Sequence, residues 1–188
     1  MTNAILDPTG LGSAGKGEHA KAALALAPRR GDLRGTTVGL LATPKQNADV
    51  FVEEVGRLLR EHEGAASVIT RTKTSVAMPA SDELVEELTR QCDVVVTGVG
   101  DCGSCSASAV ADGVIFESRG TPSAVVCSDA FIATADAMAQ TRGAPGYRYV
   151  TTQHPVAVLA ADEVRKRAVE VLPEITSLLV AGATRGEA

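Results

Sequence analysis

Hydrophobic and polar positions follow two alternating patterns from about residue 35 onward. Short apolar runs predict strands at 37–41, 67–70, 93–97, 124–127 and 147–152. The longer segments between them repeat apolar residues every three or four positions, as one face of a helix does. Five such pairs predict an α/β fold, namely a single doubly wound parallel sheet in a flavodoxin-like or Rossmann-like three-layer arrangement, with strand order 2-1-3-4-5.

Several helix ends carry local signals. Asn47 and Ser81 stand where an N-cap is expected, each before a segment with one apolar face. The last helix has an apolar stripe, and Pro173 within it is expected to bend it. The unbroken valines 94–96 suit a central strand that is covered on both faces.

Composition limits the class of protein. The 188 residues are 45% hydrophobic and 22% charged, which suits one domain with one sizeable core. We expect residues 35–188 to form this α/β domain and residues 1–34 to form an arm that packs on the core or on a neighbouring subunit. A net charge of −5, no Trp, two Tyr and three Phe argue against a nucleic-acid partner.

Membrane and export signals are not evident. No segment approaches the roughly 18 apolar residues of a membrane span, and the N-terminus has no basic stretch followed by an apolar one. We therefore expect a cytoplasmic protein without a membrane partner. The four cysteines are then more consistent with catalysis or metal binding than with a disulfide framework.

The segment Asp101-Cys102-Gly103-Ser104-Cys105 follows the third strand and leads into a helix. Residues three apart at a helix start share one face, and the helix N-terminus favours a thiolate. Such a site lowers a cysteine pKa from about 8.5 to roughly 3.5–7.5. Reactive sulfur is the first hypothesis, although half of a metal site or two inert core cysteines also fit the CxxC spacing.

The predicted strand order brings further polar residues to the same rim. Lys45 and Asn47 follow the first strand, Asp129 follows the fourth and His154 the fifth. Asp101 suits either an acid/base partner or, with slight preference, an N-cap. For His154, a role as a base and a position as a solvated loop histidine fit the sequence equally well.

Other chemistry-bearing residues have simpler interpretations. Cys92 and Cys127 suit packing positions, and His19 and His62 suit the surface. Residues 10–16 match the first part of a phosphate-binding loop, but Gly17 replaces the Ser/Thr that would hold magnesium and no strand precedes them. A glycine-rich arm is the better interpretation.

Four segments together resemble the UGSC family, which is named for a selenocysteine-Gly-Ser-Cys motif. They are Asp7-Pro8-Thr9-Gly10, Pro44-Lys45-Gln46-Asn47-Ala48-Asp49, Gly98 to Cys105, and His154-Pro155. Cys102 matches the selenocysteine position, at which many members carry cysteine. The resemblance implies catalysis by a chalcogen in a thiol-dependent small-molecule enzyme, with remote likeness to the selenocysteine subunits of reductive amino-acid cleavage.

Three classes of function follow. The favoured one is an enzyme of oxidoreductase or lyase type that uses Cys102 with Cys105, assisted by Asp101 and His154, on a small molecule without a cofactor. Expected substrate-binding residues are Asp7, Thr9, Lys45, Asn47, Gly100, Gly103, Ser104, Ser106 and Asp129. The alternatives are a zinc or iron site of Cys102 and Cys105 with Cys127 or His154, and a non-catalytic partner subunit. We expect a homo- or hetero-oligomer in each case.

Overall fold

The computed structural model describes residues 25–181 and contains one five-stranded, all-parallel sheet. Its strands are β1 (Thr37–Ala42), β2 (Ser67–Thr72), β3 (Val94–Gly100), β4 (Ser123–Ser128) and β5 (Val150–Thr152). Their order is β2-β1-β3-β4-β5. The α/β class, the parallel sheet and the predicted order are therefore confirmed.

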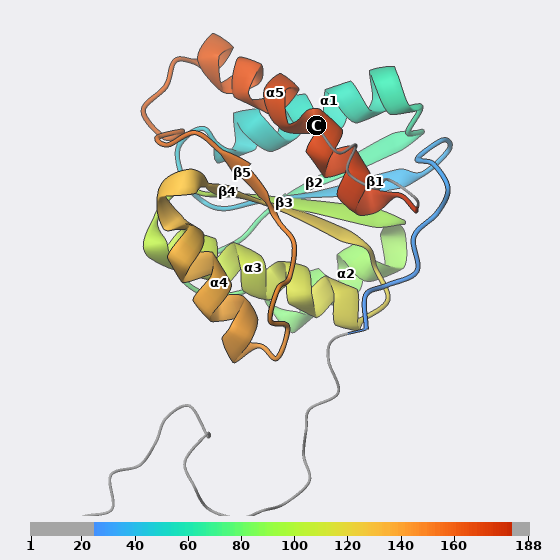
Figure 1. Ribbon diagram of the computed structural model, residues 1–188. Coiled ribbons are helices and arrows are strands. Elements are labelled where there is room, and N and C mark those ends of the chain that lie inside the picture. Colours follow the sequence, from blue (N-terminus) through green and yellow to red (C-terminus); the bar gives the residue numbers. More distant parts are fainter. Residues whose placement is uncertain (1–24, 182–188) are drawn as a thin grey trace, which may run out of the picture.

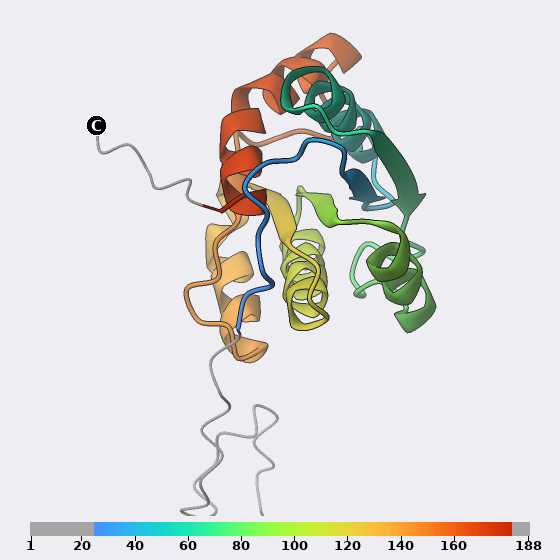
Figure 2. The same ribbon diagram turned by 90° about the vertical axis from the view of Figure 1, so that its right-hand side faces the viewer.

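Two helical layers cover this sheet (Figure 1). The helices are α1 (Ala48–Glu63), α2 (Asp82–Gln91), α3 (Gly103–Ser118), α4 (Ile132–Thr141) and α5 (Ala161–Leu179), and a short 3-10 turn, Asp129–Phe131, precedes α4. Helices α1 and α5 cover one face, and α2, α3 and α4 cover the other (Figures 1 and 2). No helix within residues 25–181 is long and apolar enough to cross a membrane.

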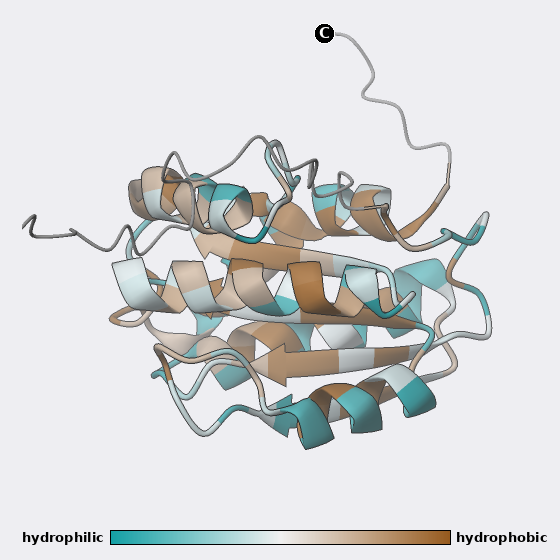
Figure 3. Cartoon of the chain, turned by 90° about the horizontal axis from the view of Figure 1, so that it is seen from below, coloured by the Kyte–Doolittle hydropathy of each residue, from teal (hydrophilic) through white to brown (hydrophobic). Residues whose placement is uncertain are grey.

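The valines of β3 divide between the two layers. Val94 and Val96 pack in the core beside α1 and α5, whereas Val95 packs with residues of α2 and α3 on the opposite face. All three are at most 1% exposed, and burying one such side chain stabilises the fold by roughly 1.5–3 kcal/mol. Figure 3 shows the strands as hydrophobic, with hydrophilic positions on outward helix surfaces. The predicted central strand is confirmed.

Two glycines allow α3 to lie close to the sheet. A Cβ on Gly100 would lie 2.6 Å from the Ser106 Cα, and one on Gly113 would lie 2.3 Å from a Val125 methyl carbon. Side chains at these positions would force α3 away from β3 and β4. The two glycines therefore allow the close packing of α3 on β3 and β4, which sets the distance between the first turn of α3 and the end of β3.

Some local predictions hold and others are wrong. Ser81 caps α2, since its hydroxyl accepts the Leu84 N–H at 3.3 Å. Asn47 stands before α1 with φ at 70°, but its side chain makes no cap bond. The fifth strand is shorter than predicted: it covers Val150–Thr152, and the Tyr147 N–H donates to the Ala144 carbonyl at 3.0 Å in the preceding turn. Pro173 lies inside α5.

Residues 25–34 lie along the amino edge of the sheet, the edge that faces the viewer in Figure 2. Arg29 forms an ion pair of 2.5 Å with the buried Glu117 near the end of α3. The Ala27 N–H donates to the same carboxylate at 2.7 Å. Further along, Arg30 pairs with Val180 in a short parallel bridge. The described chain thus begins at the edge opposite the CxxC motif.

Candidate functional site

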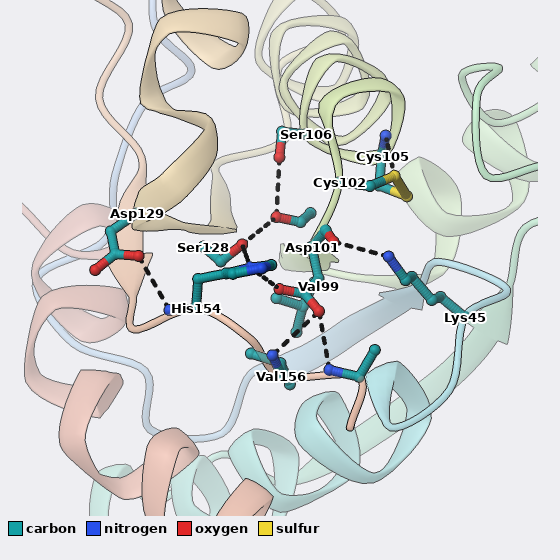
Figure 4. A network of polar contacts seen from close by, with 12 residues as sticks. Lys45, Val99, Asp101, Cys102, Cys105, Ser106, Ser128, Asp129, His154 and Val156 are labelled. Carbon is teal, nitrogen blue, oxygen red and sulfur yellow. Dashed lines mark hydrogen bonds and ion pairs between the residues drawn. A yellow bond between two sulfur atoms is a disulfide. The ribbon is translucent and has the colours of Figure 1, made fainter. Parts of the chain in front are cut away.

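The candidate site lies at the carboxyl edge of the sheet and is built from the loops after β1, β3, β4 and β5 (Figure 4). Parallel strands carry their following loops to one edge, so residues far apart in sequence meet there. Of the sequence-predicted residues, Lys45, Asp101, Cys102, Cys105, Asp129 and His154 all lie in this region.

Cys102 is the N-cap residue of α3. Its backbone is extended, and its sulfur accepts the Cys105 N–H at 3.1 Å. The Ser106 N–H donates to the Cys102 carbonyl at 2.9 Å, which starts the helix. Negative charge on this sulfur would be stabilised by the N–H bond and by the positive end of the helix. The preference for Asp101 as N-cap is wrong, because Cys102 occupies that position.

Cys102 and Cys105 are joined by a disulfide. Their Cα atoms are 5.1 Å apart, within the range that a disulfide requires. The two residues differ in access, since Cys102 is half-buried and Cys105 is only 1% exposed. An external molecule therefore reaches Cys102 first.

Asp101 faces away from this disulfide and organises the loop after β5. Its carboxylate lies 2.9 Å from Nδ1 of His154 and accepts the Val156 and Ala157 N–H groups at 3.1 and 2.8 Å. Burial raises the pKa of Asp101, but hydrogen bonds from Ala157, Ser128, Val156 and His154 outweigh it and hold the pKa below its usual range. An ionised carboxylate results, which orients His154 with Nδ1–H as donor.

His154 is held by two further contacts. Its backbone N–H donates to Asp129 Oδ1 at 3.0 Å, and its ring meets Phe131 edge-on with centroids 5.3 Å apart. Its side chain is 37% exposed, and with Nδ1 bound to Asp101 its Nε2 is available to a ligand. Figure 4 shows Cys102 and His154 on different sides of Asp101, and no hydrogen bond joins them.

Lys45 contributes positive charge at the same edge. Its ammonium donates to the Asp101 carbonyl at 2.7 Å, at the peptide that joins Asp101 to Cys102. Thr43 fixes the start of this loop, since its hydroxyl donates to the Val99 carbonyl at 3.0 Å. An ammonium next to a cysteine favours the thiolate form.

Other predicted substrate-binding residues have structural contacts. Asn47 donates through its amide to the Val156 and Leu159 carbonyls at 3.0 and 2.9 Å, which ties the start of α1 to the loop after β5. Ser106 is buried and donates to the Gly100 carbonyl at 2.9 Å. In contrast, Ser104 is exposed, and a Cβ on Gly103 would meet only the Thr134 hydroxyl, at 3.9 Å. Gly103 and Ser104 therefore form the accessible surface beside Cys102.

Two further residues, Ser128 and Lys73, make contacts for which the sequence predicted no role. The Ser128 hydroxyl donates to the Gly100 carbonyl at 3.2 Å and lies 3.3 Å from His154 Nδ1. Lys73 follows β2 and forms a buried ion pair of 2.7 Å with Asp112 on α3. Both residues stand at or just after the end of a predicted strand, and this position was the only sequence signal that they lie at the carboxyl edge of the sheet.

The other two cysteines are in the core. Burial raises the pKa of Cys92 to about 11 and that of Cys127 to about 12, so both thiols stay protonated at neutral pH. The packing interpretation of both is confirmed. Within residues 25–181, no group of three or more His, Cys, Asp or Glu side chains is placed to hold a metal ion.

Several sequence predictions lie outside the described residues. They concern Asp7, Thr9, His19 and the glycine-rich segment 10–16.

Fold and site together define a doubly wound α/β protein with a cysteine pair at the start of its central helix. The family model for the UGSC family matches residues 4–181, and the chain belongs to that family. No curated protein sequence matches it.

Among solved structures, the chain is similar to one described as an ABC transporter permease from the Pseudomonas fluorescens group, with 15% identity and a TM-score of 0.35. That alignment covers 76% of this chain and 32% of the other, and a likeness at this level carries no functional information.

Proposed function

We propose that this protein is a cysteine-dependent enzyme that acts on a small molecule, with Cys102 as the attacking nucleophile and Cys105 as the resolving thiol. The observation that carries the proposal is the position of the Cys102 sulfur. It is the N-cap of α3, accepts a backbone N–H at 3.1 Å and is more accessible than Cys105. Buried structural cysteines such as Cys127 have none of these features.

The redox version of this chemistry has two steps. The Cys102 thiolate attacks an electrophilic atom of the substrate, forms a bond to sulfur and expels the leaving group with its electron pair. The Cys105 thiolate then attacks the Cys102 sulfur, which forms the disulfide and releases the substrate fragment as an anion that takes up a proton. The substrate gains two electrons, and an external thiol reductant returns the cysteines to the reduced state.

Each neighbouring group has a defined task in this proposal. The Lys45 ammonium and the N-terminus of α3 stabilise the Cys102 thiolate. His154, oriented by ionised Asp101 at 2.9 Å, exchanges protons through Nε2 with the bound substrate. Gly103 and Ser104 leave space beside the sulfur for a small ligand. The protein is expected to act in the cytoplasm as an oligomer.

Alkylation of the reduced protein tests this proposal. Iodoacetamide at pH 7 should modify Cys102 much faster than Cys92, whose pKa is raised to about 11 by burial. Peptide mapping assigns the modified residue. Equal rates at Cys102 and Cys92 in the folded protein would contradict the proposal and favour a non-catalytic partner subunit.

Single substitutions distinguish the role of Cys102 from that of Cys105. Cys105→Ser should leave a covalent substrate adduct on Cys102 that intact-mass measurement detects, whereas Cys102→Ser should form none. Oxidised wild-type protein should be two mass units lighter than reduced protein. Adduct formation in Cys102→Ser would show that another residue is the nucleophile.

A further inference from the structure

Three polar side chains form a buried cluster next to the cysteine motif. Lys73, which follows β2, donates from its ammonium to the Ser108 hydroxyl and to the Asp112 carboxylate, the latter at 2.7 Å. All three residues are at most 3% exposed. Apolar residues often stabilise a core as well as a buried ion pair does, so stability alone does not account for these charges.

The cluster lies on the same face of α3 as Cys105. Cys105, Ser108 and Asp112 are spaced at three and then four residues on this helix, and such residues are neighbours on the helix surface. Ser108 is one turn beyond Cys105, and residues at this spacing have Cβ atoms about 5–6 Å apart. The Lys73 ammonium, which contacts Ser108, is therefore close to the turn of α3 that carries Cys105.

Burial makes Cys105 a poor nucleophile unless neighbouring groups assist it. Cys105 is 1% exposed, and burial raises the pKa of a thiol, as it does for Cys92 and Cys127, to about 11 and about 12. The attack on Cys102 needs a thiolate. A thiol shielded from water in this way requires a buried proton acceptor and a buried cation.

We propose that Asp112 accepts the proton of Cys105 and that Lys73 then faces the Cys105 thiolate. This inference rests on the proposed function, in which Cys105 is the resolving thiol. The proton passes along the Ser108 hydroxyl, which both donates and accepts, and the Lys73 ammonium, each of which gives up one proton as it receives another. Cys105 becomes a thiolate, Asp112 becomes a neutral carboxylic acid, and Lys73 stays charged.

The balance of charge favours this transfer. The Lys73 ammonium neutralises the Asp112 carboxylate before the transfer and the Cys105 thiolate after it, so the number of buried charges does not change. Burial also raises the pKa of Asp112 above its ordinary value, against the lowering effect of Lys73, and this brings it closer to the pKa of a thiol.

The thiolate then completes the resolving step. It attacks the Cys102 sulfur and forms the disulfide, and the bond from Cys102 to the substrate breaks with its electron pair on the substrate fragment. When an external thiol later reduces the disulfide, Asp112 returns its proton to Cys105. Asp112 and Lys73 thus act on the substrate only through Cys105, as positioning residues.

Other charged groups near α3 have different contacts. Arg142, at the end of α4, weakens the effect of burial on the pKa of Asp112. Lys45 binds the Asp101 carbonyl at the start of α3, beside Cys102. Helix α2 contributes apolar residues such as Val85 to the core cluster that it shares with α3. Lys73 is therefore the cation placed to serve Cys105.

Closure of the disulfide without any substrate tests the proposal. Methyl methanethiosulfonate converts reduced Cys102 to a methyl disulfide, and Cys105 then attacks the Cys102 sulfur and displaces methanethiolate. Acid quenching followed by intact-mass measurement gives the rates of both steps, and peptide mapping locates the methylthio group. The first rate reports Cys102 and the second reports Cys105.

The double variant Lys73→Met with Asp112→Leu removes both charges and keeps apolar side chains in their place. A nearby opposite charge shifts a pKa by about 1–3 units, and a more basic thiolate is also a better nucleophile. Closure at pH 7 should therefore be roughly three- to thirtyfold slower than in wild type. The midpoint of its pH profile should rise by about one unit or more. Lys73→Met alone should slow closure in the same direction and replaces the double variant if that one does not fold.

The matched control is a second buried ion pair on α3, between Arg29 and Glu117, near the other end of the helix. Arg29→Met with Glu117→Gln should leave the closure rate and its pH profile unchanged. Equal slowing in this control, or unchanged closure in the folded Lys73 variants, would overturn the inference.

The two rates also keep this inference apart from the proposed function. Attack by Cys102 on methyl methanethiosulfonate should be the same in wild type and in all of these variants. If the reagent modifies Cys102 no faster than Cys92 in wild type, the proposed function is wrong. If Cys102 reacts rapidly and closure does not depend on Lys73, only the role of the buried cluster is wrong.

Discussion

The carboxylate of Asp101 lies 2.9 Å from Nδ1 of His154, although 53 positions separate the two residues in the sequence. The same carboxylate accepts two N–H groups of the following loop. Asp101 is therefore the residue that joins the end of β3, next to Cys102, to the loop after β5.

The first prediction concerns how low pH changes the contribution of Asp101 to the stability of the fold. Burial raises the pKa of Asp101, but hydrogen bonds from Ala157, Ser128, Val156 and His154 lower it below its ordinary value in the folded protein. Its stabilising contribution is therefore complete above the unfolded-state pKa, about 3.9, and is lost as pH falls through the folded-state value. Asp101→Asn should be less stable at pH 7, and the gap from wild type should narrow below about pH 4.

Urea unfolding at pH 7 and pH 3.5 measures this effect. Asp129→Asn is the matched control, because Asp129 is exposed and accepts a single N–H, from His154. An equal loss of stability in Asp101→Asn at both pH values, or the same pH dependence in Asp129→Asn, would contradict the prediction.

The second prediction concerns the buried ion pair of Lys73 and Asp112, whose side chains are 1% and 0% exposed. Removing one charge leaves the other buried without an opposite charge, although Lys73 keeps its contacts with Ser108 and the Met78 carbonyl. Asp112→Leu should therefore lower the free energy of unfolding by about 3–5 kcal/mol. The double variant Lys73→Met with Asp112→Leu should recover much of that loss. If the loss of unfolding free energy in the double variant equals the sum of the losses in the two single variants, the two residues are not coupled.

An exposed pair provides the comparison. Arg57 and Glu61 form an ion pair one turn apart on α1, with side chains 54% and 55% exposed. Glu61→Gln should change the free energy of unfolding by about 1 kcal/mol or less. Chemical denaturation in one buffer measures the free energies of unfolding of all these variants and compares the buried pair with the exposed one.

The third prediction compares Gly100, two residues before the CxxC motif, with Gly103 inside the motif. Gly100→Ala would bring a Cβ within 2.6 Å of the Ser106 Cα and push the first turn of α3 off the sheet, at a cost of about 1–3 kcal/mol. Gly103→Ala meets only the Thr134 hydroxyl, at 3.9 Å, and should stay within about 0.5 kcal/mol of wild type. Equal effects in thermal unfolding would contradict the close packing at Gly100.

The fold was predictable because its signals are local. Apolar runs and helical periodicity fixed the strands and helices, and the unbroken valines of β3 marked the central strand. The cap of α2 at Ser81 was also predictable, since the hydroxyl and its N–H partner are three residues apart.

The roles of Asn47 and Asp101 were not predictable in this way. Cap preferences describe bonds to nearby backbone groups, whereas Asn47 binds carbonyls more than 100 positions away and Asp101 binds the loop after β5. Lys73 and Ser128 were missed for the same reason, since their partners come from other elements. Sequence pattern located the edge of the sheet that holds the site but not the bonds across it.

We propose that the start of α3 and Lys45 stabilise the Cys102 sulfur as a thiolate, and a pH titration of this thiol is the decisive experiment. The thiolate absorbance of Cys105→Ser, followed against pH, reports Cys102, because burial raises the pKa of Cys92 to about 11 and that of Cys127 to about 12. We predict a Cys102 pKa below about 7.5, and a rise in Lys45→Met. A value at or above about 8.5, the pKa of a free cysteine, would show that neither the helix start nor Lys45 stabilises the thiolate.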